Sequence, residues 1–356
     1  MSFSYLFIAA FLSSVLIRIL KKPSLRAGYV DNALYCPQGR KKHIRPTAPI
    51  GGLIAIPVAM IISAMAGFDW IAHWPLALAI IISLIMGAID DIAHLSSLKK
   101  LGVQVLIAFI LVGPGGAEIH NLGNLLGTGN IDLGVASFLF SLFCMILLIN
   151  AINMIDGLDG LLGGIGLILL GFMGLFCAIG FDSAYFTLIF PFMGAILGFY
   201  LMNMRFPWQR QAHVFFGDAG SLSLGCVIGW LAITLYNDPD LSLPSMALGW
   251  LLAFPVMDAF ALFTLRLSER RSPFDGDRYH FHHILSDSGF SDTTSVLILH
   301  AIHFLYAIIA LIIYLSGGAF EFVFFYLWLT LLITHTIIAF KAHWAEKKIH
   351  DIFSLK

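Results

Sequence analysis

The residues best suited to chemistry in this chain are two amides and two carboxylates within one short stretch, Asn150 to Gly160. Asn150 and Asn153 are followed by Asp156 and Asp159, and an apolar run lies on each side. These groups therefore sit where the chain leaves or re-enters a hydrocarbon layer, and uncompensated charge near a bilayer indicates a functional site. Asp156 and Asp159 are three residues apart and would share one face of a helical turn. A polar turn between two helices is the alternative interpretation of this stretch alone.

Further acids stand at the ends of other apolar runs. Asp90 and Asp91 end one run, and because a helix C-terminus repels negative charge, a cation must compensate them. The candidates are Lys99 and Lys100, which follow soon after, and a divalent cation; Mg²⁺ is usually held by one or two carboxylates together with substrate phosphates. Asp218 lies between glycines just before another run, where it could bind the same metal or cap a helix. The acids together predict a metal and phosphate site, with a solvated loop as the alternative for Asp90 and Asp91.

A second group of residues carries positive charge or can acquire it. Three histidines and an arginine fall within six positions: Arg278, His280, His282 and His283. They could bind zinc, but no cysteine accompanies them, and we favour a diphosphate, for which Arg and His are well suited. Lys42 and Arg45 precede a Pro/Gly turn, where they could hold a phosphate at a helix start or attract anionic lipid headgroups. Phe215 could stack on a base or anchor at the membrane interface.

Composition defines the elements that must position these groups. The chain is 59% hydrophobic and 12% charged, with a mean hydropathy of +0.90, whereas soluble proteins have about 25% charged residues. A transmembrane helix needs roughly 20 apolar residues. The sequence therefore predicts an all-α polytopic membrane protein with eleven transmembrane helices. The predicted spans are Tyr5–Leu20, Ile50–Ala66, Trp74–Ile89, Leu101–Val112, Val135–Ile149, Leu161–Ile179, Tyr185–Met202, Leu222–Leu235, Met246–Leu267, Ser295–Leu315 and Phe320–Phe340.

Lysine and arginine predict how the helices cross the membrane. With eleven spans the termini lie on opposite sides, and all 20 Lys and Arg residues then fall on the side of the C-terminus. The positive-inside rule places that side in the cytoplasm and the N-terminus outside. We therefore predict one membrane domain, residues 1–356, with its active site on the cytoplasmic face. The predicted catalytic loops lie at about residues 21–49, 90–100, 150–160, 203–221 and 268–294.

Some polar residues lie inside the apolar runs. An acid within a span faces the interior of the helix bundle and has a partner there, so we expect one for Asp258. A structural hydrogen bond and a chemical role are both open for this residue. We interpret His300, His303 and His335 as structural.

Four motifs occur in an order that resembles a known family. They are Asp90-Asp91; Asn150-x-x-Asn153-x-x-Asp156-Gly-Leu-Asp159-Gly; Phe215-Phe-Gly-Asp218-x-Gly-Ser221; and His280-x-His282-His283. In this order they resemble the polyprenyl-phosphate N-acetylhexosamine-1-phosphate transferases of glycosyl transferase family 4. The Asp-Arg-Tyr-His-x-His-His form is similar to the WecA-like branch, because the MraY branch carries a run of consecutive histidines. The resemblance covers nearly the whole chain, including the eleven-span topology.

The resemblance implies a role for each matching residue. Asp218 and Asn153 would hold Mg²⁺, with Mn²⁺ as the alternative ion, on the diphosphate of the sugar nucleotide. The residues expected in catalysis are Asp90, Asp91, Asp156 and His280. Those implied in substrate binding are Lys100 near the phosphates, Asp159 at uridine, Phe215 stacked on uracil, and Arg278, His282 and His283 at the diphosphate or hexosamine. We add Lys42 and Arg45 as candidate phosphate contacts from the first basic loop.

The reaction that the resemblance implies is transfer of GlcNAc-1-phosphate from UDP-GlcNAc to undecaprenyl phosphate, with release of UMP. It would begin a lipid-linked cell-envelope polysaccharide at the bacterial inner membrane. The second pKa of such a phosphate is about 6, so the acceptor is largely dianionic at neutral pH. Positioning and charge neutralisation should therefore matter more than general-base catalysis by Asp90. A double displacement through an aspartyl-phosphate is the alternative mechanism.

Other functions remain in competition at this stage. Another UDP-N-acetylhexosamine or an MraY-type muramoyl-pentapeptide substrate is the alternative donor. An ion-coupled transporter would carry acids near the bilayer midplane, where only Asp258 is placed. A non-catalytic scaffold would be favoured by loss of a motif acid, and none is missing. We expect contact with membrane lipids and no nucleic-acid partner, and the sequence leaves a homodimer open.

Overall fold

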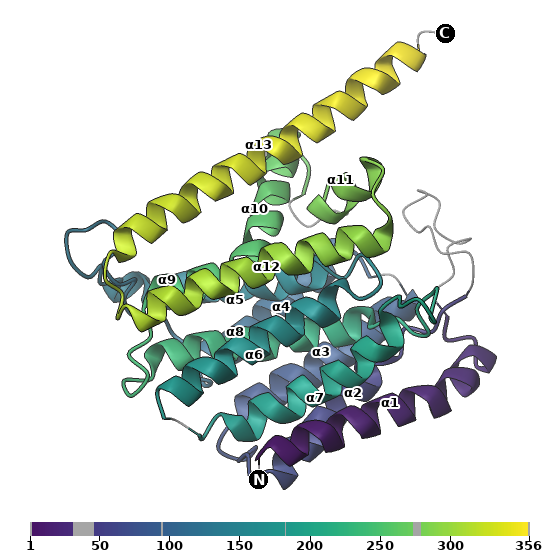
Figure 1. The fold of residues 1–356 in the computed structure, drawn as a ribbon, viewed down its shortest axis with the longest axis horizontal. Helices are drawn as coiled ribbons and strands as arrows, with labels where there is room; N and C mark the ends of the chain where they lie inside the picture. The colour runs from purple at the N-terminus through teal and green to yellow at the C-terminus, as the bar shows by residue number, and fades with distance from the viewer. Residues whose placement is uncertain (1, 31–45, 94, 182, 273–278, 355–356) are drawn as a thin grey trace.

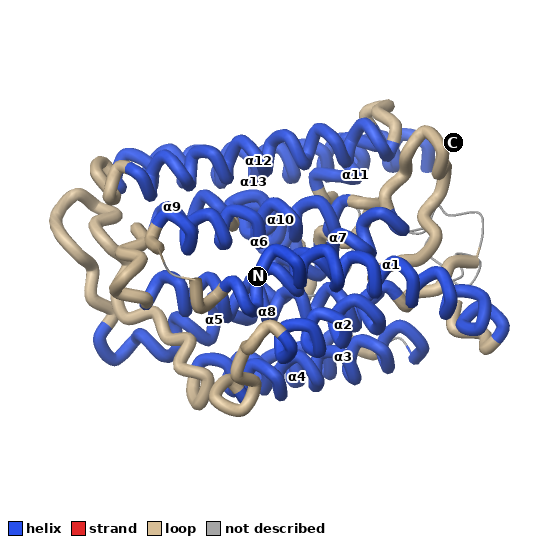
Figure 2. Tube along the Cα trace, turned by 60° about the horizontal axis from the view of Figure 1, so that its bottom comes forward, coloured by secondary structure: helices blue, strands red, loops and turns tan. Residues whose placement is uncertain are grey.

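The eleven predicted apolar runs are all helical in the computed structural model of the protein, which describes residues 2–30, 46–93, 95–181, 183–272 and 279–354. Among these residues no β-strand occurs, and helices joined by loops make up the whole trace (Figure 2). The prediction of an all-α polytopic membrane protein is confirmed. The helices are α1 (Ser2–Arg26), α2 (Gly51–Met65), α3 (Trp74–Ala93), α4 (Ser97–Val112), the 3-10 helix η2 (Gly134–Ala136), α5 (Ser137–Met154), α6 (Leu161–Ile179), α7 (Phe186–Asn203), α8 (Gly217–Asn237), α9 (Ser245–Leu251), α10 (Ala253–Ser268), α11 (Phe281–Asp287), α12 (Asp292–Leu315) and α13 (Glu321–Ser354).

Eight of the described helices are long and apolar enough to cross a membrane, and α9 with α10 makes a ninth if the bent pair is one span. Helices α2 and α4 are shorter, with 15 and 16 residues. The count of eleven spans and the orientation therefore stay predictions.

One predicted span is wrong in detail, because Met246–Leu267 is not a continuous helix. Helix α9 ends at Leu251, and α10 leaves it at an angle of 73°. Pro255 gives the physical reason: its ring would clash with the carbonyl of Leu251, four residues earlier, if the helix continued. The bend turns α10 out of the direction that the other helices share (Figure 1).

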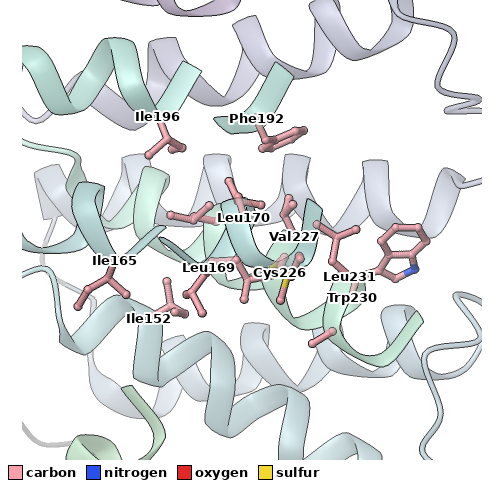
Figure 3. Packing of buried hydrophobic residues seen from close by; sticks show 14 of the residues in the cluster. Ile152, Ile165, Leu169, Leu170, Phe192, Ile196, Cys226, Val227, Trp230 and Leu231 are labelled. Carbon is pink, nitrogen blue, oxygen red and sulfur yellow. The ribbon is translucent and has the colours of Figure 1, made fainter. Parts of the chain in front are cut away.

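Helix α8 is the most enclosed of the long helices, whereas α1 and α13 have the smallest shares of buried residues. Figure 1 places α1 and α13 at opposite edges of the bundle, with α10 and α11 near α13. Buried side chains of α5, α6 and α8 meet at the centre, among them Ile152, Leu169 and Val227 (Figure 3). Since lipid tails are as apolar as these side chains, close packing rather than escape from water holds the helices together. This packing fixes the C-terminus of α5 beside the N-terminus of α8.

Glycines bring α2, α3 and α8 together backbone to backbone at the N-terminal end of α8. A Cβ on Gly87 of α3 would collide with the backbone of Ala219, and a Cβ on Gly52 of α2 would collide with that of Gly220. Only glycine permits such close approach. The result is that the C-terminal turn of α3 lies against the first turn of α8.

The loop before α8 is held by backbone hydrogen bonds to the loop before α2. The Phe215 N–H donates to the Ala48 carbonyl at 3.0 Å, and the Gly51 N–H donates to the Phe215 carbonyl at 2.9 Å. Gly217 begins α8 with φ +77°, a left-handed conformation that a side chain would strain. These contacts fix the direction in which α8 starts.

A buried carboxylate, Glu321, ties three elements at the other end of the bundle. It is 6% exposed and accepts hydrogen bonds from Ser245 Oγ at 2.7 Å, the Met246 N–H at 3.0 Å and the Asn124 N–H at 2.9 Å. We expect Glu321→Ala to lower the free energy of unfolding by about 2 kcal/mol, because buried donors lose a charged acceptor. Thermal unfolding of the purified protein in detergent measures this.

Glu118→Ala is the matched control for that prediction. Glu118 is an acid of the loop between α4 and η2, and the hydrogen bonds described for it involve only its backbone. A melting temperature that falls equally in both variants would contradict a specific role for Glu321.

Candidate active site

The carboxylates of α3 meet Asp218 in the first turn of α8. The Asp218 backbone N–H donates to Asp91 Oδ1 at 3.0 Å, and the Asp90 and Asp218 carboxyl groups share a hydrogen bond. Lys100 of α4 lies between them: its Nζ forms ion pairs with Asp90 and, at 3.2 Å, with Asp218 Oδ2. Three predicted acids and the predicted lysine are thus brought together, as their position at one end of the bundle requires.

Asn153 completes this group from α5. Its Nδ2 donates to Asp218 Oδ1 at 3.1 Å and to Ser221 Oγ at 2.8 Å. The two residues expected to hold the metal are therefore neighbours. Asn150, one turn earlier, instead faces α4, where its amide exchanges hydrogen bonds of 3.2 and 3.0 Å with Gln104. Asn150 thus joins α4 to α5 and leaves Asn153 as the amide of the site.

The turn between α5 and α6 is not helical, so its two acids do not share a helical face. Burial together with the charges of Asp218, Asp91 and Asp159 raises the pKa of Asp156 to about 8. Asp159 instead accepts from Arg205 Nε at 2.7 Å. The same guanidinium contacts Asp292 Oδ2 of α12 through Nη1 at 3.0 Å. The role of Asp159 at uridine stays a prediction.

The raised pKa of Asp156 predicts how stability depends on pH. The unfolded chain loses this proton near pH 3.8, whereas the folded protein keeps it up to about pH 8. The folded state therefore binds more protons between these values, and stability falls as pH rises from about 4 to 8. In EDTA, we expect the melting temperature of the wild type to fall between pH 6 and pH 8 by more than that of Asp156→Asn. Equal slopes in the two proteins would contradict the burial of this carboxyl group.

Residues 280–283, called the histidine loop below, lead into the first turn of α11 and lie against the turn between α5 and α6. A Cβ on Gly157 would collide with the His282 ring, so His282 Nε2 faces the backbone beside Asp156. His282 is 1% exposed, and neither ring nitrogen has a hydrogen-bond partner among the described residues. Burial and the neighbouring His280 and His283 hold the pKa of His282 well below its usual range, so its ring is neutral. A buried ring with two unpaired nitrogens beside the carboxylates is a candidate ligand contact.

The rings of His280, His282 and His283 form one cluster, with centroids 5.2 Å apart for the first two and 4.2 Å for the last two. The predicted substrate contacts Arg278, Lys42 and Arg45 lie outside the described residues. His300 is not part of this cluster. Its Nε2 contacts the Leu161 carbonyl at 3.1 Å, within the helix bundle. This position fits the structural role expected for His300.

Phe215 and Phe216 differ in their surroundings. Phe216 is 1% exposed and packs on Phe199 of α7, with ring centroids 4.4 Å apart. Phe215 is only partly buried, directly before Gly217 and Asp218. Of the two aromatic rings, Phe215 is therefore the one that a ligand could reach.

The structure adds two residues that sequence reasoning did not place in the site. The Tyr29 hydroxyl donates to Asp91 Oδ2 at 3.4 Å, and burial and this carboxylate raise the Tyr29 pKa. By sequence, Arg205 is only one of the basic residues on the predicted cytoplasmic side, yet it bridges Asp159 and Asp292. No local pattern marks either residue, because their partners are distant in sequence.

An apolar cavity lies elsewhere in the bundle. It has a volume of about 310 Å³ and lies between α5, α8, α9 and α13, near the loop that Glu321 holds. Its walls are almost entirely apolar, with Asn121, Tyr236 and Ser245 among the few polar residues. Such a cavity does not suit a phosphate, so the carboxylate and histidine cluster is the better candidate for chemistry.

Comparison with known proteins agrees with this arrangement. The model of the family described as Glycosyl transferase family 4 matches residues 73–236, which run from the start of α3 to the end of α8. A protein of Pasteurella multocida is 31% identical over 296 residues, which cover 82% of this chain and 80% of the relative. The chain belongs to glycosyl transferase family 4.

Other relatives match to a similar extent. A Haemophilus influenzae protein is 30% identical over 82% of this chain and 81% of its own length, and one of Escherichia coli K12 is 28% identical over 78% and 75%. All three relatives are named undecaprenyl-phosphate alpha-N-acetylglucosaminyl 1-phosphate transferase. The family segment contains Asp90, Asp91, Asn153, Asp156 and Asp218, whereas the histidine loop lies beyond it. The site of this family member is thus completed by residues from outside the matched segment.

Proposed function

We propose that this protein transfers GlcNAc-1-phosphate from UDP-GlcNAc to undecaprenyl phosphate and releases UMP. The observation that supports it most is the meeting of Asp90, Asp91 and Asp218 around Lys100 at one end of a membrane-spanning bundle. The names of the relatives supply the acceptor lipid and the sugar phosphate. We place the reaction at the cytoplasmic face of a bacterial inner membrane, where the positive-inside rule puts these loops.

The donor set fits Mg²⁺. The carboxylate oxygens of Asp90 and Asp218 share a hydrogen bond, and the side-chain amide of Asn153 lies beside them. Among the described residues, no group of three or more His, Cys, Asp or Glu side chains is arranged so that it could bind a metal ion by itself. Mg²⁺ needs none, because one or two carboxylates and the substrate phosphates usually hold it. We propose that Asp218 and Asn153 hold the ion, which when bound supplies positive charge to the donor diphosphate.

The reaction needs one bond to form and one to break. An oxygen of the acceptor phosphate attacks the β-phosphorus of the donor, and the bond from that phosphorus to the bridging oxygen breaks, so UMP leaves with the electron pair. Lys100 and the histidine loop bring the two anionic substrates together and offset their charge. Asp90 and Asp91 keep Lys100 and the start of α8 in place. Because the acceptor is already ionised, no strong general base is required.

The test is UMP release by purified protein with undecaprenyl phosphate, Mg²⁺ and a panel of UDP-sugars. We expect release with UDP-GlcNAc that requires the lipid and stops in EDTA. Release with UDP-GalNAc alone would keep the chemistry and change the donor. Absence of release with every UDP-sugar, from protein that remains monodisperse and melts cooperatively, would overturn the proposal in favour of a transporter or a scaffold.

A further inference from the structure

Asp258 of α10 is a buried acid that the proposed reaction has not used. The residue is 1% exposed and lies in α10 three positions after Pro255. Oδ2 contacts His280 Nδ1 at 2.8 Å, and Oδ1 accepts from the Phe281 N–H at 2.9 Å. His335 of α13 reaches the same Oδ1 through Nε2 at 3.4 Å. One carboxylate therefore holds the start of α11 and connects it to two further helices.

This arrangement determines which nitrogen of His280 carries the proton. A carboxylate has only acceptors to offer, so His280 Nδ1 must donate the 2.8 Å hydrogen bond. The neutral ring then has its lone pair at Nε2, and a second proton would bind there and give an imidazolium beside the carboxylate. A carboxylate paired with a histidine in this way fixes both the tautomer and the orientation of the ring.

The ring so oriented belongs to the cluster that lies against the Asp156 turn. His280 stacks on His282 at 5.2 Å with the ring planes 19° apart, and His282 contacts Gly157. The Phe281 ring stacks on His335 at 4.9 Å, which holds the other side of the loop. The interpretation of His335 as merely part of the bundle is thus incomplete, because it shares the carboxylate that orients His280.

We infer that Asp258 is a positioning residue for His280: it holds the proton on Nδ1, so Nε2 is the nitrogen that takes up a second proton from solvent and, as Nε2–H of an imidazolium, donates a hydrogen bond to the anionic diphosphate of the donor. The inference rests on the proposed function for its catalytic consequence, but the tautomer itself does not. The bend at Pro255 serves the site, because it turns Asp258 toward α11 instead of along the direction of α9.

Asp258→Asn separates this role from simple packing. Asn has nearly the same shape, and its Oδ1 can still accept the Phe281 N–H. Its NH₂ group then faces His280 Nδ1, which must become an acceptor, so the proton moves to Nε2. The ring then stays neutral, because a second proton on Nδ1 would face the NH₂ group, and the diphosphate loses the positive charge of the imidazolium. We expect kcat for UMP release to fall about 10- to 100-fold, the usual effect of losing a partner that orients a histidine, with little change in KM for the UDP-sugar.

A double-mutant cycle with His280→Gln gives the decisive kinetic comparison. If Asp258 acts through His280, Asp258→Asn in the His280→Gln background should cost no further activity. Losses that multiply in the double variant would overturn the inference and make Asp258 a purely structural residue. Asp238→Asn is the matched control, because Asp238 also accepts a 2.8 Å hydrogen bond, from Tyr185, but at the opposite end of α8; we expect its activity to equal the wild type.

NMR of protein labelled with ¹³C and ¹⁵N at histidine tests the tautomer without turnover. The His280 signal is assigned by its absence from His280→Gln. We expect the proton of the neutral ring on Nδ1 in the wild type and on Nε2 in Asp258→Asn. A neutral wild-type ring with its proton on Nε2 would overturn the inference even in an active enzyme. If both proteins show the expected tautomers but the wild type releases no UMP, the positioning role stands and only the proposed function is rejected.

Discussion

Asp218→Asn is expected to lower UMP release on the order of 10³-fold while the protein stays folded in the membrane. The substitution removes the charge that Asn153 and Lys100 contact, and with it the one carboxylate that lies at the start of α8. Loss of a group that organises charge around a reacting phosphate typically costs 10²–10³ in rate, and a metal ligand adds to that loss. The measurement is initial-rate UMP release at saturating undecaprenyl phosphate and Mg²⁺.

Asp240→Asn provides the control for charge removal alone. Asp240 is an exposed acid in the turn after α8, so its substitution also removes a negative charge but does so far from Asp218 along that helix. We expect its rate to match the wild type. A rate for Asp218→Asn within a few-fold of the wild type would remove Asp218 from the metal site.

The acids of the site could be predicted from sequence because each stands next to an apolar run. A carboxylate or amide side chain at such a boundary is informative wherever the span is placed, so the sequence predicts that Asp90, Asn153 and Asp218 lie at one end of the bundle. The structure brings them within hydrogen-bonding distance of each other or of Lys100. The all-α membrane fold followed equally directly from the length and composition of the apolar runs.

Contacts between distant residues could not be predicted in this way. Asp258 and His280 are 22 positions apart and meet only because α10 bends away from α9. In the sequence, nothing distinguishes Arg205 from the other basic residues on the predicted cytoplasmic side, so its ion pairs with Asp159 and Asp292 could not be predicted. Both contacts depend on the angle at which helices leave a bend or a loop, and hydropathy carries no information about that angle.

Gly87→Ala is expected to lower both the stability of the bundle and the rate of UMP release. The new Cβ would meet the backbone of Ala219, which cannot move aside as a flexible side chain could. Overpacking of this kind costs roughly 1–3 kcal/mol, more than the 0.5–1 kcal/mol that alanine gains over glycine within a helix. Since Gly87 lies one turn before Asp90 and Asp91, the displacement acts directly on the carboxylates, and a shift of about 1 Å can cost 10²-fold in rate.

Gly171→Ala separates this steric effect from the general effect of adding a methyl group to a membrane helix. A Cβ on Gly171 of α6 would meet nothing within 4 Å, so only the gain in helix propensity remains. We expect Gly171→Ala to melt at or slightly above the wild-type temperature with full UMP release, and Gly87→Ala to melt lower with about 10²-fold less. If Gly87→Ala kept full activity, the site would not depend on the backbone contact between α3 and α8. Loss of activity without loss of stability would instead mean that the helices can separate at little cost, and that the glycine serves to align Asp90 and Asp91 with Asp218.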